Sequence, residues 1–321
     1  MISRRTCLQL LPALATLPLS ALAQAYPSRP VRFIVPLSPG SGTDVVARYM
    51  SAELAKTMGG SFVVENRMGA SGIIGTDFVA KAPADGYTIL FNYAAHYSNQ
   101  FVEKTPYDAV ADFEPIARLA TSAMVLVTAA NSPLHTVRDL ITAAKRKPDG
   151  LSYGSPGNGT TPQMAAALMS NMAGIRMNHI AYKAPAQVVI DVAGGQLDAG
   201  FGGVATSLPL VKAGRLRVLA VTSRQRSTYF PDAPTLDEAG LKGYELVTPI
   251  WAFVRRGTPQ AIISQLSDAM TKAAAAPAFK AFCTSQGLEV DIQDAAKARS
   301  NAAAELERWK NLVALSQAKA G

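Results

Sequence analysis

The stretch "VPLSPGSGTD", residues 35–44, joins an apolar run to the start of a helical pattern. The run "VRFIV" (31–35) is rich in β-branched residues and predicts a buried strand, and residues 43–58 have the periodicity of a helix. A glycine loop between a strand and a helix leaves free N–H groups at the helix N-terminus, where the helix dipole also favours an anion. For one loop alone, a plain capped turn is the simpler explanation, and an anion-binding loop becomes the favoured interpretation only if the arrangement is repeated elsewhere in the chain.

The rest of the chain repeats this alternation of strand and helix. Such a pattern is typical of α/β folds with mostly parallel sheets, and two series of it predict two lobes. We expect further strands in "FVVE", "YTILF", "MVLVTA" (124–129), "LSYG", "HIAY", "LDAGFGG", "RVLAVTS" and "YELVTPIWAFV" (244–254). We expect further helices at 72–82, 136–146, 160–173, 185–193 and 204–213, and a helical stretch at 259–318.

Two more glycine-rich junctions precede predicted helices. "YGSPGNGTT" (153–161) lies in the second series, and "ENRMGASGIIGTD" (65–77) lies in the first. Two anion-binding loops in facing lobes describe a cleft that closes on a small anion. Hydrogen bonds to a charged group contribute ~1.5–3 kcal/mol each, and micromolar affinity needs roughly 8 kcal/mol. A few backbone amides therefore suffice, without a buried arginine.

The N-terminal 25 residues have the features of a signal peptide. Arg4 and Arg5 precede an apolar segment, and small-x-small cleavage sites end at Ala23 and Ala25. The motif "SRRTCLQ" also resembles a twin-arginine signal, so both the general secretory and the twin-arginine routes stay open. We expect an exported protein that does not itself span a membrane. Removing both arginines lowers the net charge from +8 to +6, and Cys283 is then the one remaining cysteine, which excludes a disulfide framework.

Several function classes lack their sequence signatures. The basic residues are scattered, which argues against a nucleic-acid partner. The chain has no GxxxxGK[ST], no GxGxxG at the first turn and no GxSxG. His96, His135 and His179 lack metal-ligand spacing, so we expect no metal and no cofactor. Asp44, His96 and a serine are the best available triad for a secreted hydrolase, but any long chain offers such a set, and we expect no catalytic residue.

Several long motifs follow one another along the chain: "YPSRPVRFIVPLSPGSGTDVVAR" (26–48), "VVENRMGASGIIGTDFVAKAPADGYTIL" (63–90), and the later "LSYGSPGNGTT", "GGQLDAGF" and "PDAPTLDEAG". In these motifs and their order the chain resembles the Bug family, the periplasmic receptors of tripartite tricarboxylate transporters. The resemblance covers essentially the whole predicted mature chain. It implies a two-lobed type II periplasmic binding protein that captures a small carboxylate and delivers it to a membrane permease. We expect a monomer in the periplasm.

The limits of the lobes and the site residues follow as expectations. The first lobe comprises 26–123 and 226–321, with a return crossing at 224–235, and the second comprises 124–225. In the resembled family, backbone amides of the two glycine loops hold the ligand carboxylates. The expected binding residues are Leu37, Ser38, Gly40, Ser41, Thr43, Asp44, Tyr93, Ser155, Gly157, Asn158, Gly159, Thr160, Gln163, Ala184 and Gly202.

The chain also departs from the family pattern at informative positions. Gln163 stands where histidine is usual, Ser71 where glycine is frequent, and Gly202 where the family usually places an aspartate facing the cleft. Losing that acid favours a less polar ligand, such as an aromatic carboxylate, with Leu37, Tyr93 and Tyr97 as apolar walls. Bridging waters for a polar ligand are the alternative. A sensor that docks to a signalling receptor has the same cleft, so the sequence leaves transport and sensing open.

Overall fold

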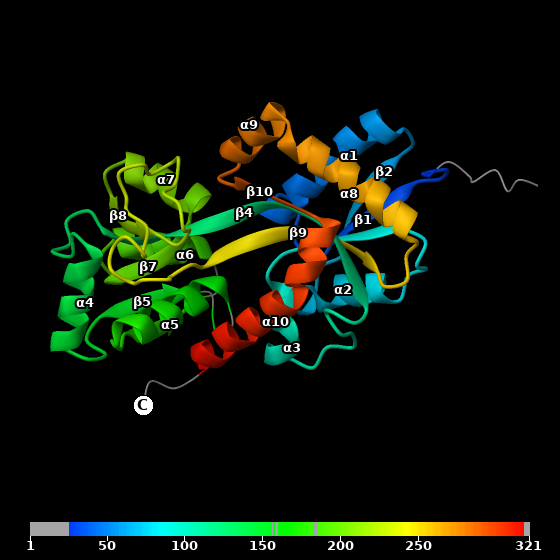
Figure 1. Cartoon of the computed structure of the whole chain (residues 1–321). Coiled ribbons are helices and arrows are strands. Elements are labelled where there is room, and N and C mark those ends of the chain that lie inside the picture. The colour runs from blue at the N-terminus through cyan, green and yellow to red at the C-terminus, as the bar shows by residue number, and fades with distance from the viewer. Residues whose placement is uncertain (1–25, 156, 158–159, 183–184, 318–321) are drawn as a thin grey trace, which may run out of the picture.

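The computed structural model describes residues 26–155, 157, 160–182 and 185–317, which form a two-lobed α/β fold (Figure 1). The strands are β1 (Val31–Val35), β2 (Phe62–Asn66), β3 (Thr88–Asn92), β4 (Phe113–Ala129), β5 (Ser152–Ser155), β6 (Asn178–Ala181), β7 (Ala199–Gly203), β8 (Leu216–Val221), β9 (Val247–Arg255) and β10 (Glu289–Asp294). The helices are α1 (Gly42–Met58), η1 (Ala70–Gly72), α2 (Ile73–Ala80), α3 (Ala95–Val102), α4 (Val137–Arg146), α5 (Thr161–Ala173), α6 (Pro185–Ala193), α7 (Val204–Lys212), α8 (Gln260–Ala275), α9 (Pro277–Ser285) and α10 (Ala295–Gln317).

One continuous sheet runs through both lobes in the order β2-β1-β3-β9-β4-β7-β5-β6, with β8 and β10 also paired to β4. Pairs within a lobe are parallel, as predicted: β1 with β2 and β3, and β5 with β6 and β7. Every pair that includes β4 or β9 is antiparallel. The expectation of mostly parallel sheets therefore holds inside the lobes and fails along these two strands.

The strands β4 and β9 connect the lobes. The first part of β4 pairs with β9 and β10, and its last part pairs with β7 and β8. We call the part built on β1, β2, β3 and β10 lobe 1, and the part built on β5 to β8 lobe 2. The sequence predicted a strand only over 124–129, because Glu114, Pro115 and Arg118 interrupt the apolar pattern of the preceding half.

The return to lobe 1 follows β9 and not the predicted crossing at 224–235. Phe230 and Ala233 in that segment pack in one apolar cluster with Val125 and Val127 of lobe 2. This polar, proline-containing segment therefore lies on lobe 2. The limits at 123/124 and 225/226 stay a prediction.

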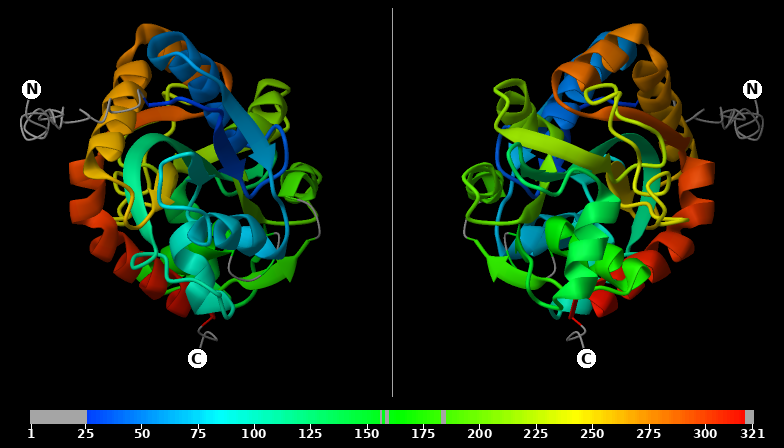
Figure 2. Two further views of the ribbon diagram at one scale, coloured as in Figure 1. Left: turned by 90° about the vertical axis from the view of Figure 1, so that its right-hand side faces the viewer. Right: turned by 90° about the vertical axis from the view of Figure 1, so that its left-hand side faces the viewer.

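Helices cover both faces of the sheet in lobe 1. On one face α1, α8 and α9 pack over Phe33 and Phe91, and Figure 2 shows these helices side by side. On the other face α2, α3 and α10 pack over Ile34, Leu90 and Trp251, in a cluster that continues into α4 and α5 of lobe 2. The helix α10 therefore lies against both lobes (Figure 1).

The C-terminal region differs in one respect from the predicted helical stretch. Residues 289–294 form the strand β10, which pairs with β4 at the edge of lobe 1. Its charged, half-exposed sequence "EVDIQD" carries little strand signal, so its pairing partner decides its conformation. Among the helices of the described residues, none has the length and apolar character needed to cross a membrane.

Candidate functional site

The first glycine loop is held in place by Asp44. This carboxylate is buried and accepts hydrogen bonds from the Gly40 amide at 2.9 Å, Arg48 Nε at 2.9 Å and Asn66 Nδ2 at 2.8 Å. Burial acts to raise the pKa of Asp44, but these hydrogen bonds outweigh it and lower the pKa below its usual value. The negative charge of Asp44 is thus paired with Arg48 and bonded within the loop, where it fixes the loop conformation.

The same loop leaves the first amides of α1 available. Ser41 is the N-cap, and its hydroxyl accepts the Asp44 amide at 3.3 Å, while the Val45 amide bonds to the Ser41 carbonyl. A helix supplies no internal partner for its first N–H groups. The amides of Gly42 and Thr43 therefore remain for an external acceptor.

The second glycine loop contains a serine–histidine pair. Ser155 Oγ lies 2.7 Å from His179 Nε2 and accepts the Gly157 amide at 3.1 Å, and Thr160 Oγ1 donates to the Gly157 carbonyl at 2.7 Å. Burial lowers the pKa of His179. A catalytic serine needs access to substrate, but Ser155 is fully buried and bonded within its own loop. The pair is therefore within hydrogen-bond distance, but its serine is closed off from a substrate, and the contact shapes the loop.

A cavity of about 220 Å³ lies between the lobes, against the crossing strands. The first residues of α1 and α5 and the N-cap of α7 line it, so three helix N-termini meet there. Burial raises the pKa of Tyr93, one of its walls, so this phenol is neutral. The lining residues are Leu37, Gly42, Thr43, Tyr93, Ser122, Met124, Thr161, Gly203, Thr248, Ile250 and Leu288.

The cavity lining combines the positive ends of helices with uncharged side chains. Helix N-termini carry partial positive charge and present N–H donors. None of the described residues that line the cavity has a charged side chain. Hydroxyls of Thr43, Ser122, Thr161 and Thr248 add further hydrogen-bonding groups. The arrangement suits an anionic group attached to an apolar body.

The predicted site residues take different positions. Leu37, Thr43 and Tyr93 line the cavity. The predicted Ser38, Gly40 and Ser41 form the turn beside it, in which the Ser41 amide donates to the Ser38 carbonyl. Tyr97, the expected apolar wall, lies instead in the core with its ring edge on Trp251. Asn158, Gly159 and Ala184 lie outside the described residues, as does the predicted signal peptide.

Gln163 is not among the described residues that line the cavity. Its side chain is buried, and Nε2 donates to the Ser316 carbonyl of α10 at 2.6 Å. The sequence placed it next to the second glycine loop correctly, but could not reveal a partner 153 residues away.

The expectation that residue 202 faces the cleft does not agree with the structure. A Cβ atom on Gly202 would lie 2.4 Å from Ser207 Oγ and 2.6 Å from Val189 Cγ1, which belong to α7 and α6. Position 202 thus points beneath these helices, and the neighbouring Gly203 lines the cavity. A side chain at position 202 would therefore meet α6 and α7, so the absence of an aspartate there does not indicate a less polar ligand.

The sequence did not predict several other lining residues, because their positions depend on the pairing of strands that are distant in sequence. Ser122 and Thr248 are register partners on β4 and β9, and Ile250 and Met124 follow on the same strands. Gly42, Thr161 and Gly203 flank predicted residues, so the strand–glycine–helix pattern did indicate their neighbourhood.

The histidines lie in separate environments. His96 is buried, stacks on Phe253 with ring centroids 4.0 Å apart, and its Nε2 lies 2.9 Å from the Ala109 carbonyl oxygen. Burial lowers its pKa to about 4. The described residues contain no group of three or more His, Cys, Asp and Glu side chains arranged to hold a metal.

Comparison with known proteins identifies the family. Residues 46–317 match the family described as the tripartite tricarboxylate transporter family receptor. The chain belongs to this family. A UPF0065 protein from the tcbD-tcbE intergenic region of Pseudomonas sp. strain P51 is 36% identical over 297 residues, covering 90% of this chain and 87% of the relative. Protein BugT of Bordetella pertussis is 33% identical over 302 residues and covers 92% of each chain.

Solved structures agree with this assignment. Rpa4515 of R. palustris, solved with adipate, is 32% identical with a TM-score of 0.77 and covers 91% of this chain and 98% of its own. MatC of Rhodopseudomonas palustris, with bound malate, is 25% identical with a TM-score of 0.73 and covers 90% of this chain and 100% of its own.

Proposed function

We propose that this receptor captures a small organic carboxylate in the cavity between its lobes, in the periplasm, and delivers it to a membrane permease of the tripartite tricarboxylate type. The observation that carries the proposal is the meeting of three helix N-termini in a cavity whose described lining has no charged side chain. Backbone amides, and not a basic residue, then hold the ligand carboxylate.

The apolar walls favour a carboxylate with an apolar body. Leu37, Tyr93, Met124, Ile250 and Leu288 offer hydrocarbon and aromatic surface to the cavity. The cavity of about 220 Å³ is smaller than the ~300–1,000 Å³ of pockets for drug-sized ligands, so the ligand is small. The proposed ligands are short aliphatic dicarboxylates and monocyclic aromatic carboxylates.

The relatives support the ligand class and the partner. One related structure carries adipate and another carries malate, and both are carboxylates. The family takes its description from tripartite transporters, which supports a permease as the partner. Export by the predicted signal peptide at 1–25 would place the receptor where it meets such a solute.

A ligand screen tests the proposal. Protein comprising residues 26–321 is denatured and refolded to remove bound ligand, and its thermal unfolding is followed with aliphatic carboxylates, aromatic carboxylates and amino acids. A ligand at 100 times its Kd stabilises the folded state by ~2.7 kcal/mol, which raises Tm by several degrees. We expect dicarboxylates or aromatic carboxylates to raise Tm. Stabilisation by amino acids alone would contradict the proposed ligand class, and no shift with any carboxylate would contradict capture itself.

A further inference from the structure

The contact between Gln163 and Ser316 joins the ligand-facing turn of α5 to the end of α10. Gln163 is the third residue of α5, and its amide donates to the Ser316 carbonyl at 2.6 Å with both residues buried. A hydrogen bond in such a low-dielectric environment is strong and leaves an expensive unpaired group when broken. The position of the first turn of α5 is therefore tied to α10.

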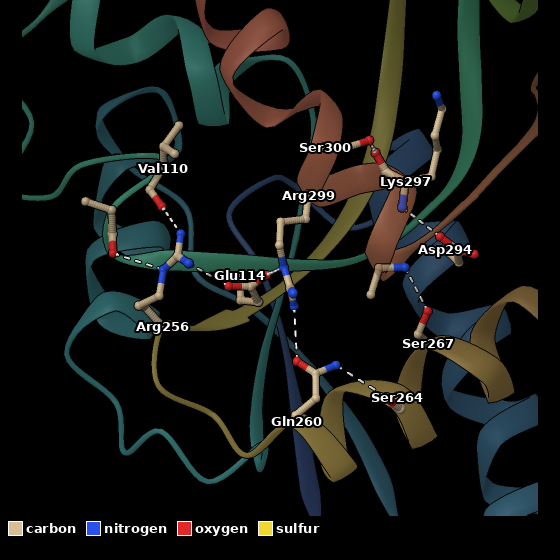
Figure 3. Close-up of polar contacts among 12 residues, drawn as sticks. Val110, Glu114, Arg256, Gln260, Ser264, Ser267, Asp294, Lys297, Arg299 and Ser300 are labelled. Carbon is tan, nitrogen blue, oxygen red and sulfur yellow. Dashed lines mark hydrogen bonds and ion pairs between the residues drawn. The ribbon is translucent and has the colours of Figure 1, made fainter.

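The other end of α10 is fixed to lobe 1. Arg299 bonds to the buried carboxylate of Glu114 on β4, and its Nη2 donates to Gln260 Oε1 at 3.3 Å (Figure 3). The same carboxylate accepts Arg256 Nη1 at 2.8 Å. At the beginning of the helix, the Ala295 amide donates to Ser267 Oγ at 2.9 Å. The first turns of α10 are thus attached to lobe 1.

The middle of α10 continues this attachment. Glu305 accepts the indole N–H of Trp309 at 3.2 Å and lies 3.6 Å from a guanidinium nitrogen of Arg118 on β4. Arg308 donates to the Glu245 carbonyl at 3.1 Å, immediately before β9. Because these contacts attach α10 to lobe 1, they also fix the position of the Ser316 carbonyl, which Gln163 of lobe 2 contacts.

The first turn of α5 also carries part of the cavity. Thr161, its first residue, lines the cavity, and Thr160 at the N-cap holds the Gly157 carbonyl of the second glycine loop at 2.7 Å. A shift of this turn moves the amides at the N-terminus of α5 relative to those of α1.

We propose that Gln163 is a positioning residue for ligand capture. Through the Ser316 carbonyl it holds the N-terminus of α5 at the distance from α1 at which one small anion contacts both lobes. This inference rests on the proposed function, because it names a residue that sets the geometry of that site without touching the ligand.

Two changes each remove the hydrogen bond between Gln163 and Ser316, one at the donor and the other at the acceptor. Gln163→Met keeps the length of the side chain but has no N–H donor, and a chain that ends at Val313 has no Ser316 carbonyl. Gln163→His restores a ring N–H at this position. Tyr244→Phe is the matched control, because Tyr244 donates another buried hydrogen bond to α5, at the Ala165 carbonyl 3.0 Å away.

Adipate affinity and hydrogen exchange are the two readouts. We expect Gln163→Met to weaken adipate binding by about tenfold, the effect of roughly one hydrogen bond. We expect the shortened chain to weaken it equally, and the combination to weaken it no further. Gln163→His should bind like the wild type. Tyr244→Phe should lower Tm without changing adipate affinity. Amides of 161–166 should exchange faster in Gln163→Met while those of α8 do not change.

Unchanged adipate affinity and unchanged exchange of α5 in Gln163→Met would overturn the inference. Additive effects of the two changes would overturn it as well, because they would show separate causes. If the wild type does not bind adipate, that ligand fails for the proposed function, while hydrogen exchange still decides whether Gln163 positions α5.

Discussion

Ser122 on β4 and Thr248 on β9 are register partners, and both line the cavity at the point where the two strands pass from lobe 1 to lobe 2. Their flanking residues Thr121, Ala123 and Val247 are buried, whereas Ser122 and Thr248 are half-buried. The strands that connect the lobes therefore also supply hydroxyl groups to the floor of the proposed binding site.

Removing either hydroxyl should weaken ligand binding without unfolding the protein. Thr248→Val keeps the shape of the side chain, and Ser122→Ala removes one atom. We expect a reduction in carboxylate affinity of up to about tenfold for each, since a net hydrogen bond contributes ~0.5–1.5 kcal/mol. Isothermal titration at a temperature well below Tm measures this. Wild-type affinity in both variants would show that these hydroxyls do not contact the ligand.

The close packing around Gly202 predicts that adding a side chain there lowers stability. Gly202→Ala should lower the free energy of unfolding by ~1–3 kcal/mol, because its Cβ overlaps Ser207 Oγ and Val189 Cγ1. Ser207 Oγ is buried, and among the described residues it has no hydrogen-bond partner, so Ser207→Ala should cost little. The double variant should recover part of the loss, which urea unfolding detects. If Gly202→Ala lowers the free energy of unfolding equally in the wild type and in Ser207→Ala, the predicted overlap is contradicted.

The loop before α2 stores backbone strain at Ser71. Its φ is +53°, in the left-handed region that favours glycine, and Gly69, Ala70 and Gly72 around it also have positive φ. Ser71→Gly should stabilise the protein by up to ~1 kcal/mol, whereas Gly72→Ala, with φ of +94° and a Cβ 3.3 Å from Pro36, should destabilise it. Chemical unfolding of both variants tests whether the two substitutions change the free energy of unfolding in opposite directions. A loss of stability in Ser71→Gly would mean that the serine side chain contributes more than its backbone costs.

His96 should make folding sensitive to mild acid. Its folded pKa of about 4 is below the unfolded value of 6.5, so the unfolded chain takes up a proton first as pH falls. The neutral His96 side chain contributes roughly 3 kcal/mol to the free energy of unfolding. This contribution is fully present above pH 6.5, declines as pH falls, and is lost at about pH 4. His96→Phe should remove this part of the pH dependence between pH 6.5 and 4. The same slope in both proteins would assign the effect to other groups.

Local patterns in the sequence predicted much of the fold. The β-branched run at 31–35 is the strand β1, and the predicted helix at 185–193 has the bounds of α6. These signals are local, because periodicity and caps depend on nearby residues. The strand–glycine–helix pattern likewise indicated Leu37 and Thr43, which line the cavity.

Features that depend on distant contacts could not be predicted in this way. The strand β10 exists because it pairs with β4, and Gln163 has its conformation because α10 returns to α5. The direction of residue 202 depends on which face of β7 carries α6 and α7. The family resemblance implied a binding role for positions 163 and 202, but the orientation of both residues depends on the assembled fold.

Gly203 allows the most direct test of capture by helix N-termini. It lines the cavity as the N-cap of α7, its φ of −70° suits any residue, and a Cβ there meets only Thr206 Oγ1 at 3.6 Å. Asp and Asn are both good N-caps, so Gly203→Asp and Gly203→Asn should fold equally well. They differ in one charge placed inside the cavity.

The decisive measurement is calorimetric titration of wild type, Gly203→Asn and Gly203→Asp with the carboxylate that stabilises the wild type most. We predict that Gly203→Asn retains binding within about tenfold and that Gly203→Asp loses at least another hundredfold, since two like charges in a low-dielectric cavity repel strongly. Equal affinities of the two variants would contradict the account, because the ligand carboxylate would then lie elsewhere.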